Sequence, residues 1–142
     1  MSSHLIERLT AECGYPLLNE RNLGAFLAGG GHSVLFFTED PTRYPESNDV
    51  AVILPELMRA FGDRCRAGVI ERDAEKCLQQ RYGFAAWPAL VLLRGDAYLG
   101  AVTRVQDWAD YLAEFERLFA AAPSRPPGIG VPLVEAPAGG CH

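Results

Sequence analysis

Apolar residues follow two different spacings along this chain, and stretches of the two kinds alternate. Spacings of three and four residues, typical of helices with one buried face, occur at residues 3–13, 20–28, 73–82 and 105–122, and from a cap within 47–49 to about 61. Apolar runs typical of strands occur at residues 33–38, 66–71, 89–93 and 97–102, after a short extended piece at 15–18. The chain is therefore predicted to alternate helices with strands.

The same spacing predicts which helical side chains enter the core. In the helix that ends near residue 61, the expected inward set is Val52, Ile53, Leu57 and Phe61. In the last helix it is Trp108, Leu112, Phe115 and Phe119. Asn19 and Asp73 are the predicted caps of the second and fourth helices, because their short polar side chains can accept hydrogen bonds from free backbone N–H groups.

The order of these elements predicts an α/β fold. Strands that alternate with helices favour parallel pairing, whereas the turn signal at residues 94–96 predicts that the last two strands form an antiparallel hairpin. We therefore expect a central mixed sheet of four to five strands, flanked by helices, in one domain of residues 1–122. Residues 123–142 hold five prolines and four glycines, which predicts a C-terminal tail without a packed element.

The Trp87-Pro88 step immediately precedes the most apolar predicted strand. Proline cannot donate a hydrogen bond to a sheet, so it is found at the first residue of a strand or at an edge. The residue ahead of it can then present its backbone outward instead of pairing it within the sheet. We expect function at this position, with Trp87 as an apolar anchor; the alternative is that Trp87 only packs beneath the loop at residues 39–49.

Composition and charge narrow the range of partners. The net charge is −5, which argues against a nucleic-acid binder held by phosphate contacts. Within residues 39–56 the charged side chains are Glu39, Asp40, Glu46, Asp49, Glu56 and one base, Arg43, a net charge of −4. This window is either a solvated acidic loop and helix start or a docking face for a basic peptide.

The sequence also predicts where the protein is located and whether it inserts into a membrane. No apolar run approaches the roughly 20 residues that span a bilayer, and the N-terminus has no cationic start followed by an apolar block. We therefore expect a cytoplasmic protein that does not insert into a membrane.

The cysteines and histidines do not form a metal or redox motif. No two of the four cysteines have the C-x-x-C spacing, and the three histidines do not complete a set of paired ligands two to four residues apart. The glycine run at residues 29–31 lacks the Gly-Lys-Ser/Thr continuation of a phosphate loop. We therefore expect neither a metal nor a cofactor.

Two blocks of the chain resemble thioredoxins. Residues 82–96, which include Trp87-Pro88, resemble the block around the cis-proline of that family, and residues 34–37 with 54–57 resemble its central strand and proline-kinked helix. The resemblance covers residues 17–119 and implies a thioredoxin-like fold with Trp87-Pro88 in cis. Residues 41–49 stand where thioredoxins have Trp-Cys-x-x-Cys, and Phe37 stands where they have a buried acid. These departures imply that redox catalysis is lost.

Within this fold the chain resembles the hydrogenase expression/formation protein family of the HyaE/HupG type. That resemblance implies a non-catalytic maturation chaperone for [NiFe] hydrogenase. It would bind the twin-arginine signal peptide of the small-subunit precursor before export, with other maturation proteins as further candidate partners.

We predict peptide-binding residues from the two features together, the cis-proline platform and the acidic window. They are Trp87, Pro88, Glu39, Asp40, Glu46 and Asp49. Two alternatives remain open at this point. One is a generic thioredoxin-like interaction module, and the other is a thiol-disulfide oxidoreductase that uses Cys65 and Cys77.

Overall fold

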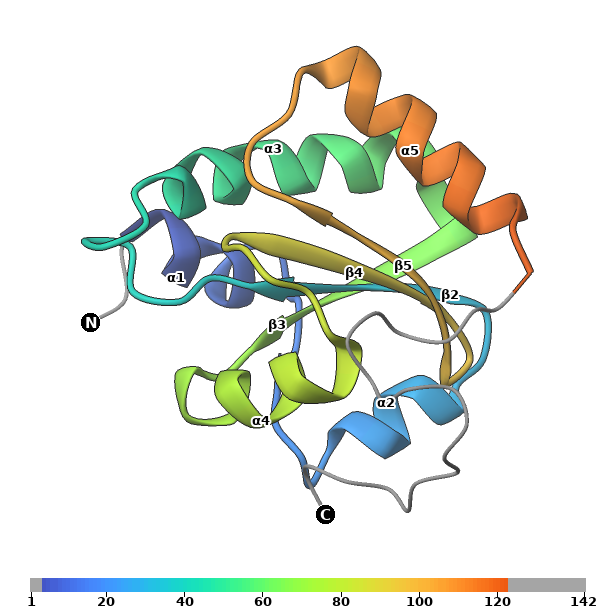
Figure 1. Cartoon of the computed structure of the whole chain (residues 1–142), viewed down its shortest axis with the longest axis horizontal. Coiled ribbons are helices and arrows are strands. Elements are labelled where there is room, and N and C mark those ends of the chain that lie inside the picture. The colour runs from blue at the N-terminus through green and yellow to red at the C-terminus, as the bar shows by residue number, and fades with distance from the viewer. Residues whose placement is uncertain (1–3, 123–142) are drawn as a thin grey trace.

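Five strands form one mixed sheet in the computed structural model, which describes residues 4–122 (Figure 1). The strands are β1 (Leu17–Leu18), β2 (His32–Phe37), β3 (Cys65–Ile70), β4 (Ala89–Arg94) and β5 (Ala97–Thr103), in the order β1-β3-β2-β4-β5. β3 runs parallel to β1 and β2, whereas β4 is antiparallel to both β2 and β5. The predicted mixed sheet and its closing hairpin are confirmed.

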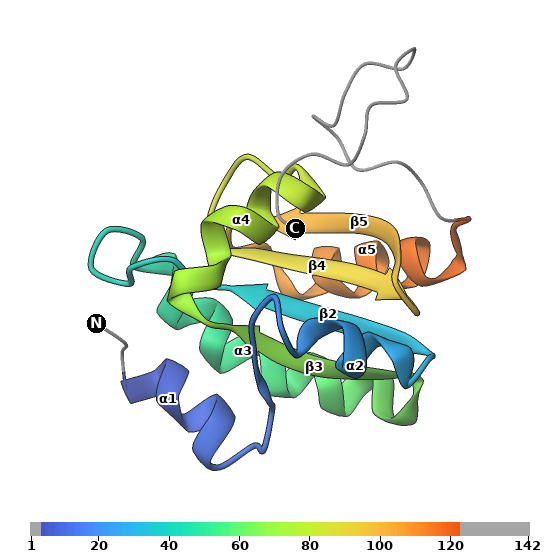
Figure 2. The same cartoon turned by 90° about the horizontal axis from the view of Figure 1, so that it is seen from below.

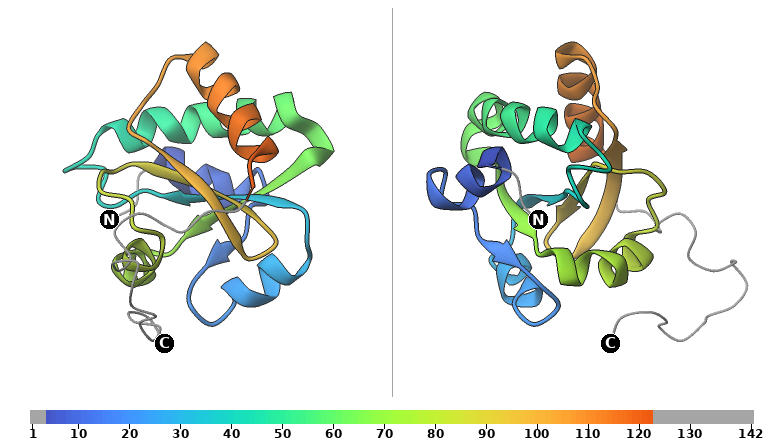
Figure 3. Two further views of the ribbon diagram at one scale, coloured as in Figure 1. Left: turned by 45° about the vertical axis from the view of Figure 1, so that its right-hand side comes forward. Right: turned by 90° about the vertical axis from the view of Figure 1, so that its left-hand side faces the viewer.

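Helices cover both faces of the sheet. They are α1 (His4–Ala11), α2 (Leu23–Ala28), α3 (Glu46–Phe61), α4 (Arg72–Tyr82) and α5 (Trp108–Ala120), with a short 3₁₀ turn η1 (Gly62–Arg64) before β3. Figures 1 and 2 show α3 and α5 on one face and α2 and α4 on the other. Figure 3 shows the same layering from two further directions.

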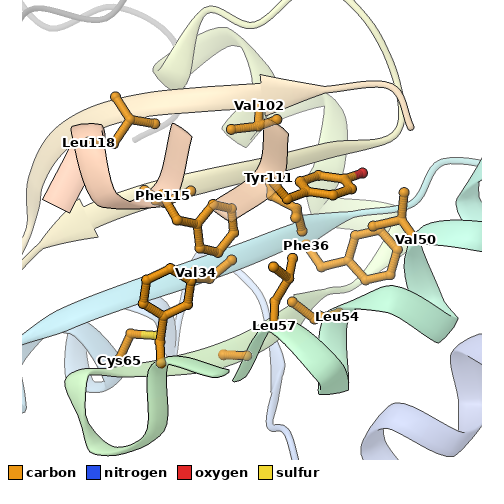
Figure 4. Packing of buried hydrophobic residues seen from close by; sticks show 14 of the residues in the cluster. Val34, Phe36, Val50, Leu54, Leu57, Cys65, Val102, Tyr111, Phe115 and Leu118 are labelled. Atoms are coloured by element: carbon orange, nitrogen blue, oxygen red, sulfur yellow. The ribbon is translucent and has the colours of Figure 1, made fainter. Parts of the chain in front are cut away.

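The alternation of side chains along the central strand explains why both faces need a cover. Val34 and Phe36 point into a core beneath α1, α3 and α5, while Leu35 and Phe37 point into a second core beneath α2 and α4. All four are fully buried. Figure 4 shows the first core, where Tyr111 and other side chains of α5 and α3 meet those of the sheet. The strand whose residues 34–37 are apolar and buried without alternation is therefore central in this sheet.

Two side chains predicted to be buried are instead exposed. Val52 is 54% exposed, because it lies two residues from the fully buried Leu54 and hence about 200° around the helix. Trp108 is 45% exposed because it is the first residue of α5, whose N-terminal end stands away from the sheet (Figure 1). The inward positions of α5 are Tyr111, Phe115, Leu118 and Phe119.

The helix starts also differ from the predicted caps. α4 begins at Arg72, so Asp73 lies in its first turn and does not cap it. Asn19 stands three residues ahead of Asn22, the N-cap of α2, and its side chain accepts the N–H groups of Arg21 and Asn22. Asn19 therefore stabilises the turn that leads into the helix.

The Trp87-Pro88 peptide bond is cis, as predicted from the thioredoxin-like block. The prediction of a C-terminal tail falls on residues 123–142, which lie outside the described residues.

Candidate functional site

Two loops meet at one end of the central strands. Phe37 at the end of β2 pairs with Ala89 at the start of β4, so residues 38–45 and residues 83–88 leave the sheet side by side. The first of these loops contains Glu39 with a φ of 52°. The second contains the cis bond before Pro88. This end of the sheet lies at the left of Figure 1, where β4 begins and the chain passes from β2 into α3.

A groove of about 380 Å³ opens between these loops. It is lined by Arg43, Tyr44, Pro45, Glu46, Ala85, Ala86, Trp87 and Arg104. The Trp87 ring lies 5.2 Å from the Phe84 ring and 6.0 Å from the Tyr44 ring, measured between centroids. Trp87 is therefore packed between the two loops and remains partly exposed in the groove.

The main chain at Trp87 is available for pairing. Among the backbone hydrogen bonds of the described loops and turns, none involves the Trp87 N–H or carbonyl, whereas the Pro88 carbonyl accepts the N–H of Arg104 at 2.7 Å. Pairing with β5 therefore begins one residue after Trp87. An extended segment laid along the groove could form hydrogen bonds with this free peptide group.

Glu75 of α4 lies beneath the groove and was not predicted as a site residue. It is only 3% exposed. Its Oε1 accepts the N–H of Glu39 at 2.8 Å and the indole Nε1–H of Trp87 at 3.0 Å, and its Oε2 lies 3.2 Å from Thr38 Oγ1. Burial raises the pKa of this carboxyl to about 7, although its three hydrogen bonds act in the opposite direction.

Two of the predicted acids hold the first loop in shape. Glu39 accepts the N–H of Asp40 and forms an ion pair with Arg72 at 3.3 Å. Asp40 accepts the backbone N–H and the hydroxyl of Thr42, and these bonds lower the pKa of its carboxyl. Neither acid lines the groove. Glu39 is nevertheless linked to Trp87, because Glu75 binds both.

The other two predicted acids lie on α3. Glu46 lines the groove, and Arg104 donates to both of its carboxylate oxygens, with Nε to Oε1 at 2.9 Å. Glu46 also accepts the N–H of Val105, and these bonds lower its pKa to about 2. Asp49 is exposed one turn further along α3 and is not among the groove residues. The structure therefore brings Trp87 and Glu46 into one groove.

The groove also contains two arginines that the sequence prediction did not include. Arg104 is held by Glu46, and the guanidinium carbon of Arg43 lies 5.5 Å from the centroid of the Tyr44 ring. With Glu46 as the lining acid, the charged side chains of the groove give it a small positive charge. The carboxylates left for a cationic partner, Asp40 and Asp49, lie outside this lining.

The oxidoreductase alternative finds little support in the geometry. Cys65 is a free thiol, so the structure contains no Cys65–Cys77 disulfide. Cys65 pairs with His32, at the end of β2 opposite Phe37 and about 16 Å from the groove along the strand. Burial raises the pKa of Cys65 to about 11, which disfavours the reactive thiolate.

Metal-ligand clusters and membrane-spanning helices are both absent from residues 4–122. Their histidine, cysteine, aspartate and glutamate side chains nowhere form a group of three that could hold a metal ion. Every helix in this part of the chain falls short of the length and apolar content that a membrane span requires.

A weak signal in the sequence could have identified Glu75. On α4 the buried positions Ala74, Leu78 and Tyr82 recur every four residues, and Glu75 lies on the same side, three residues before Leu78. An acid on an inward stripe needs buried partners, so it is a candidate for a structural or functional role. Its partners come from residues 38, 39 and 87, which only the tertiary structure brings together.

Comparison with known proteins gives a consistent result. A family model described as Hydrogenase-1 expression protein HyaE matches residues 5–111. The hydrogenase expression/formation protein HoxO of Cupriavidus necator is 44% identical over 141 residues, which cover 97% of this chain and 88% of the relative. The protein of the same name from Azotobacter vinelandii is 49% identical over 116 residues, covering 82% and 78%.

Solved structures agree with these matches. The crystal structure of hydrogenase expression/formation protein hupG from Rhodopseudomonas palustris is 39% identical and superposes with a TM-score of 0.54, over 74% of this chain and 95% of that one. A thioredoxin variant from Halobacterium salinarum superposes with a TM-score of 0.61 at 17% identity, over 77% and 93%. The second match concerns the fold alone, and it confirms the predicted thioredoxin-like architecture.

Proposed function

Because the chain belongs to the hydrogenase expression/formation protein family, we propose that it is a non-catalytic maturation chaperone for [NiFe] hydrogenase. It binds the twin-arginine signal peptide of the small-subunit precursor and keeps it bound before export. The precursor carries this peptide in the cytoplasm, so the proposed site of action is cytoplasmic. Other hydrogenase maturation proteins are further candidate partners.

The observation that carries this proposal is the groove beside the cis bond. It combines partly exposed aromatic surface on Trp87 and Tyr44 with a Trp87 peptide group that forms no backbone hydrogen bond among the described residues. An extended peptide can add to such an edge through its main chain while an apolar side chain packs on the rings. The apolar segment of a signal peptide has this chemistry.

The charge distribution favours a position for the two arginines of the peptide outside the groove. Arg43 and Arg104 would repel them inside it, and Glu46 is already bound to Arg104. Asp40 and Asp49 are the acids of the predicted set that no arginine of the described chain pairs with. We therefore place the apolar segment on Trp87 and the arginines toward these two carboxylates.

Absence of catalysis is part of the proposal. Residues 38–49 contain no cysteine, and the pKa of the buried Cys65 thiol is raised away from the range of reactive cysteines. The nucleophile that thioredoxin chemistry requires is thus missing from the loop, and the platform is left to hold a peptide.

Peptide titration tests this function directly. We expect a leader peptide from a hydrogenase small-subunit precursor to bind, and a version with both arginines changed to lysine to bind on the order of tenfold more weakly, since lysine lacks the bidentate geometry of guanidinium on carboxylate. Isothermal titration calorimetry measures both. A leader peptide with the arginines kept but its apolar segment replaced by serine and glycine is the matched control for the groove.

Binding of neither arginine nor lysine peptide would contradict the proposal and leave a generic interaction module. Equal affinity for the arginine and the lysine peptides would show that carboxylates of this protein do not recognise the arginine pair. Reduction of a disulfide substrate by the wild-type protein, lost in a Cys65→Ser/Cys77→Ser variant, would restore the oxidoreductase alternative.

A further inference from the structure

We propose that Glu75 is a positioning residue that fixes the Trp87 indole in the groove by tying it to the end of β2. This inference rests on the proposed function, because it concerns the same peptide-binding groove. It assigns a role to the buried acid of that region, which neither the groove lining nor the predicted site includes.

The contacts of Glu75 join three segments that are distant in sequence. Its carboxyl lies on α4, and it binds the backbone of Glu39 at 2.8 Å and the indole of Trp87 at 3.0 Å, with Thr38 Oγ1 at 3.2 Å. One buried group thus determines where the loop leaves β2 and where the residue before Pro88 places its side chain. The Trp87 ring and the Tyr44 ring are the aromatic side chains that line the groove, so the orientation of Trp87 affects the groove shape.

The hydrogen bonds are complete when the carboxyl is neutral. Oε1 accepts both N–H groups, the acid O–H on Oε2 can donate to Thr38 Oγ1, and Thr38 donates to the Glu39 carbonyl at 3.1 Å. When the carboxyl is ionised, Thr38 donates to Oε2 instead. Glutamine reproduces the neutral pattern, whereas leucine cannot accept either N–H group.

The charges around Glu75 are few. From the first loop, Glu39 faces it and raises its pKa, and the carboxylate of Glu39 is itself paired with Arg72. Asp40 follows Glu39 in the same loop. Residues 83–88 bring no charged side chain. Desolvation is therefore the main cause of the raised pKa, and a titration of Glu75 near pH 7 should be visible at Trp87.

A role in thiol chemistry does not fit this acid. Residues 38–49 and 83–88 contain no cysteine, and Cys65 begins β3 beside His32, at the end of β2 opposite Phe37. Cys77 lies two residues from Glu75 on α4 and hence about 200° around the helix. The groups that Glu75 does contact are two N–H donors and a hydroxyl. Holding those groups in place is the function its geometry supports.

Binding of an N-acetylated leader peptide to four variants tests the inference. We expect Glu75→Leu to weaken binding about tenfold and Glu75→Gln to stay within about threefold of wild type. Trp87→Phe keeps a smaller aromatic ring but loses the indole N–H, and it should also weaken binding about tenfold. The double variant Glu75→Leu/Trp87→Phe should bind the peptide with an affinity within about threefold of that of Trp87→Phe, because both changes break the same Glu75–Trp87 hydrogen bond. Circular dichroism checks that each variant folds.

Fluorescence of the free protein tests the same link without a peptide. The chain has two tryptophans, so Trp108→Phe leaves Trp87 as the sole reporter. We expect its emission to change in one step centred near pH 7, the pKa of Glu75. The step should vanish in Glu75→Gln and persist in Asp73→Asn, which removes an exposed acid of the same helix.

The outcomes separate this inference from the proposed function. Wild-type affinity in Glu75→Leu, or additive losses in the double variant, would overturn the positioning role while the chaperone function stands. Failure of every leader peptide to bind would overturn the proposed function and the binding part of the inference with it. An emission step near pH 7 that survives Glu75→Gln would overturn the Glu75–Trp87 link by itself.

Discussion

At the scale of single residues, the acids in and around the groove have very different roles. The carboxylate of Glu46 is ionised, but its oxygens already accept hydrogen bonds from Arg104 and from the Val105 N–H, which lower its pKa to about 2. Asp40 shapes its own turn through Thr42. Glu75, 29 residues beyond Glu46, has its pKa raised to about 7 because burial dominates. The partners of each carboxylate, and not its sequence neighbours, decide whether it can receive a ligand.

The raised pKa of Glu75 predicts a specific dependence of stability on pH. Its contribution is fully present below the ordinary pKa of 4.5 and is lost as pH rises toward 7, because the unfolded chain ionises there while the folded one stays protonated. Between these values wild type should lose about 3 kcal/mol of unfolding free energy relative to Glu75→Gln. Urea unfolding of both proteins at pH 4.5 and pH 8 measures the change, and an unchanged difference would contradict it.

At the scale of elements, close packing of α5 on β5 depends on a glycine. A Cβ at Gly100 would lie 2.5 Å from Leu118 Cδ2, a distance that the buried leucine can relieve only by moving within the core. The inward stripe of α5 can therefore approach the sheet because β5 has no side chain at that position. The Arg104–Glu46 pair at the end of β5 joins this packed layer to the groove.

Gly100→Ala is accordingly expected to destabilise the protein by about 1–3 kcal/mol through overpacking. Gly24→Ala is the matched control, since a Cβ there meets nothing within 4 Å and the residue lies inside α2. Alanine should stabilise that helix by about 0.5–1 kcal/mol. Thermal unfolding of the two variants should give shifts of opposite sign, and equal shifts would contradict this account of the β5–α5 contact.

At the scale of the whole molecule, the fold and the charge distribution serve different purposes. The thioredoxin-like sheet places the cis-proline loop beside the end of β2, as the sequence resemblance predicted, and the family membership predicted from that resemblance is confirmed. Most of the net charge of −5 comes from residues 39–56, next to this loop. Such a field attracts cationic partners over a longer range than any single ion pair.

Affinity for the leader peptide should therefore fall as salt is added. Exposed charges are screened within about 8 Å at physiological ionic strength, so raising salt from 50 mM to 500 mM should weaken binding on the order of tenfold if the two arginines meet exposed carboxylates. A leader peptide with glutamines in place of both arginines is the control and should respond little to salt. Constant or stronger binding of the arginine peptide would contradict a carboxylate-based interaction.

The sequence by itself determined the elements, the mixed sheet and the Trp87-Pro88 position, because these depend on local periodicity and on the backbone limits of proline. The sequence did not predict burial correctly at Val52 and Trp108. Both fit a periodic pattern, yet Val52 lies on the outer side of α3 and Trp108 begins α5 beyond the sheet. Only the tertiary structure decided which side chains meet. It paired Glu46 with Arg104 and brought Glu75 to Trp87, because hydrogen bonds between residues far apart in sequence leave no periodic trace.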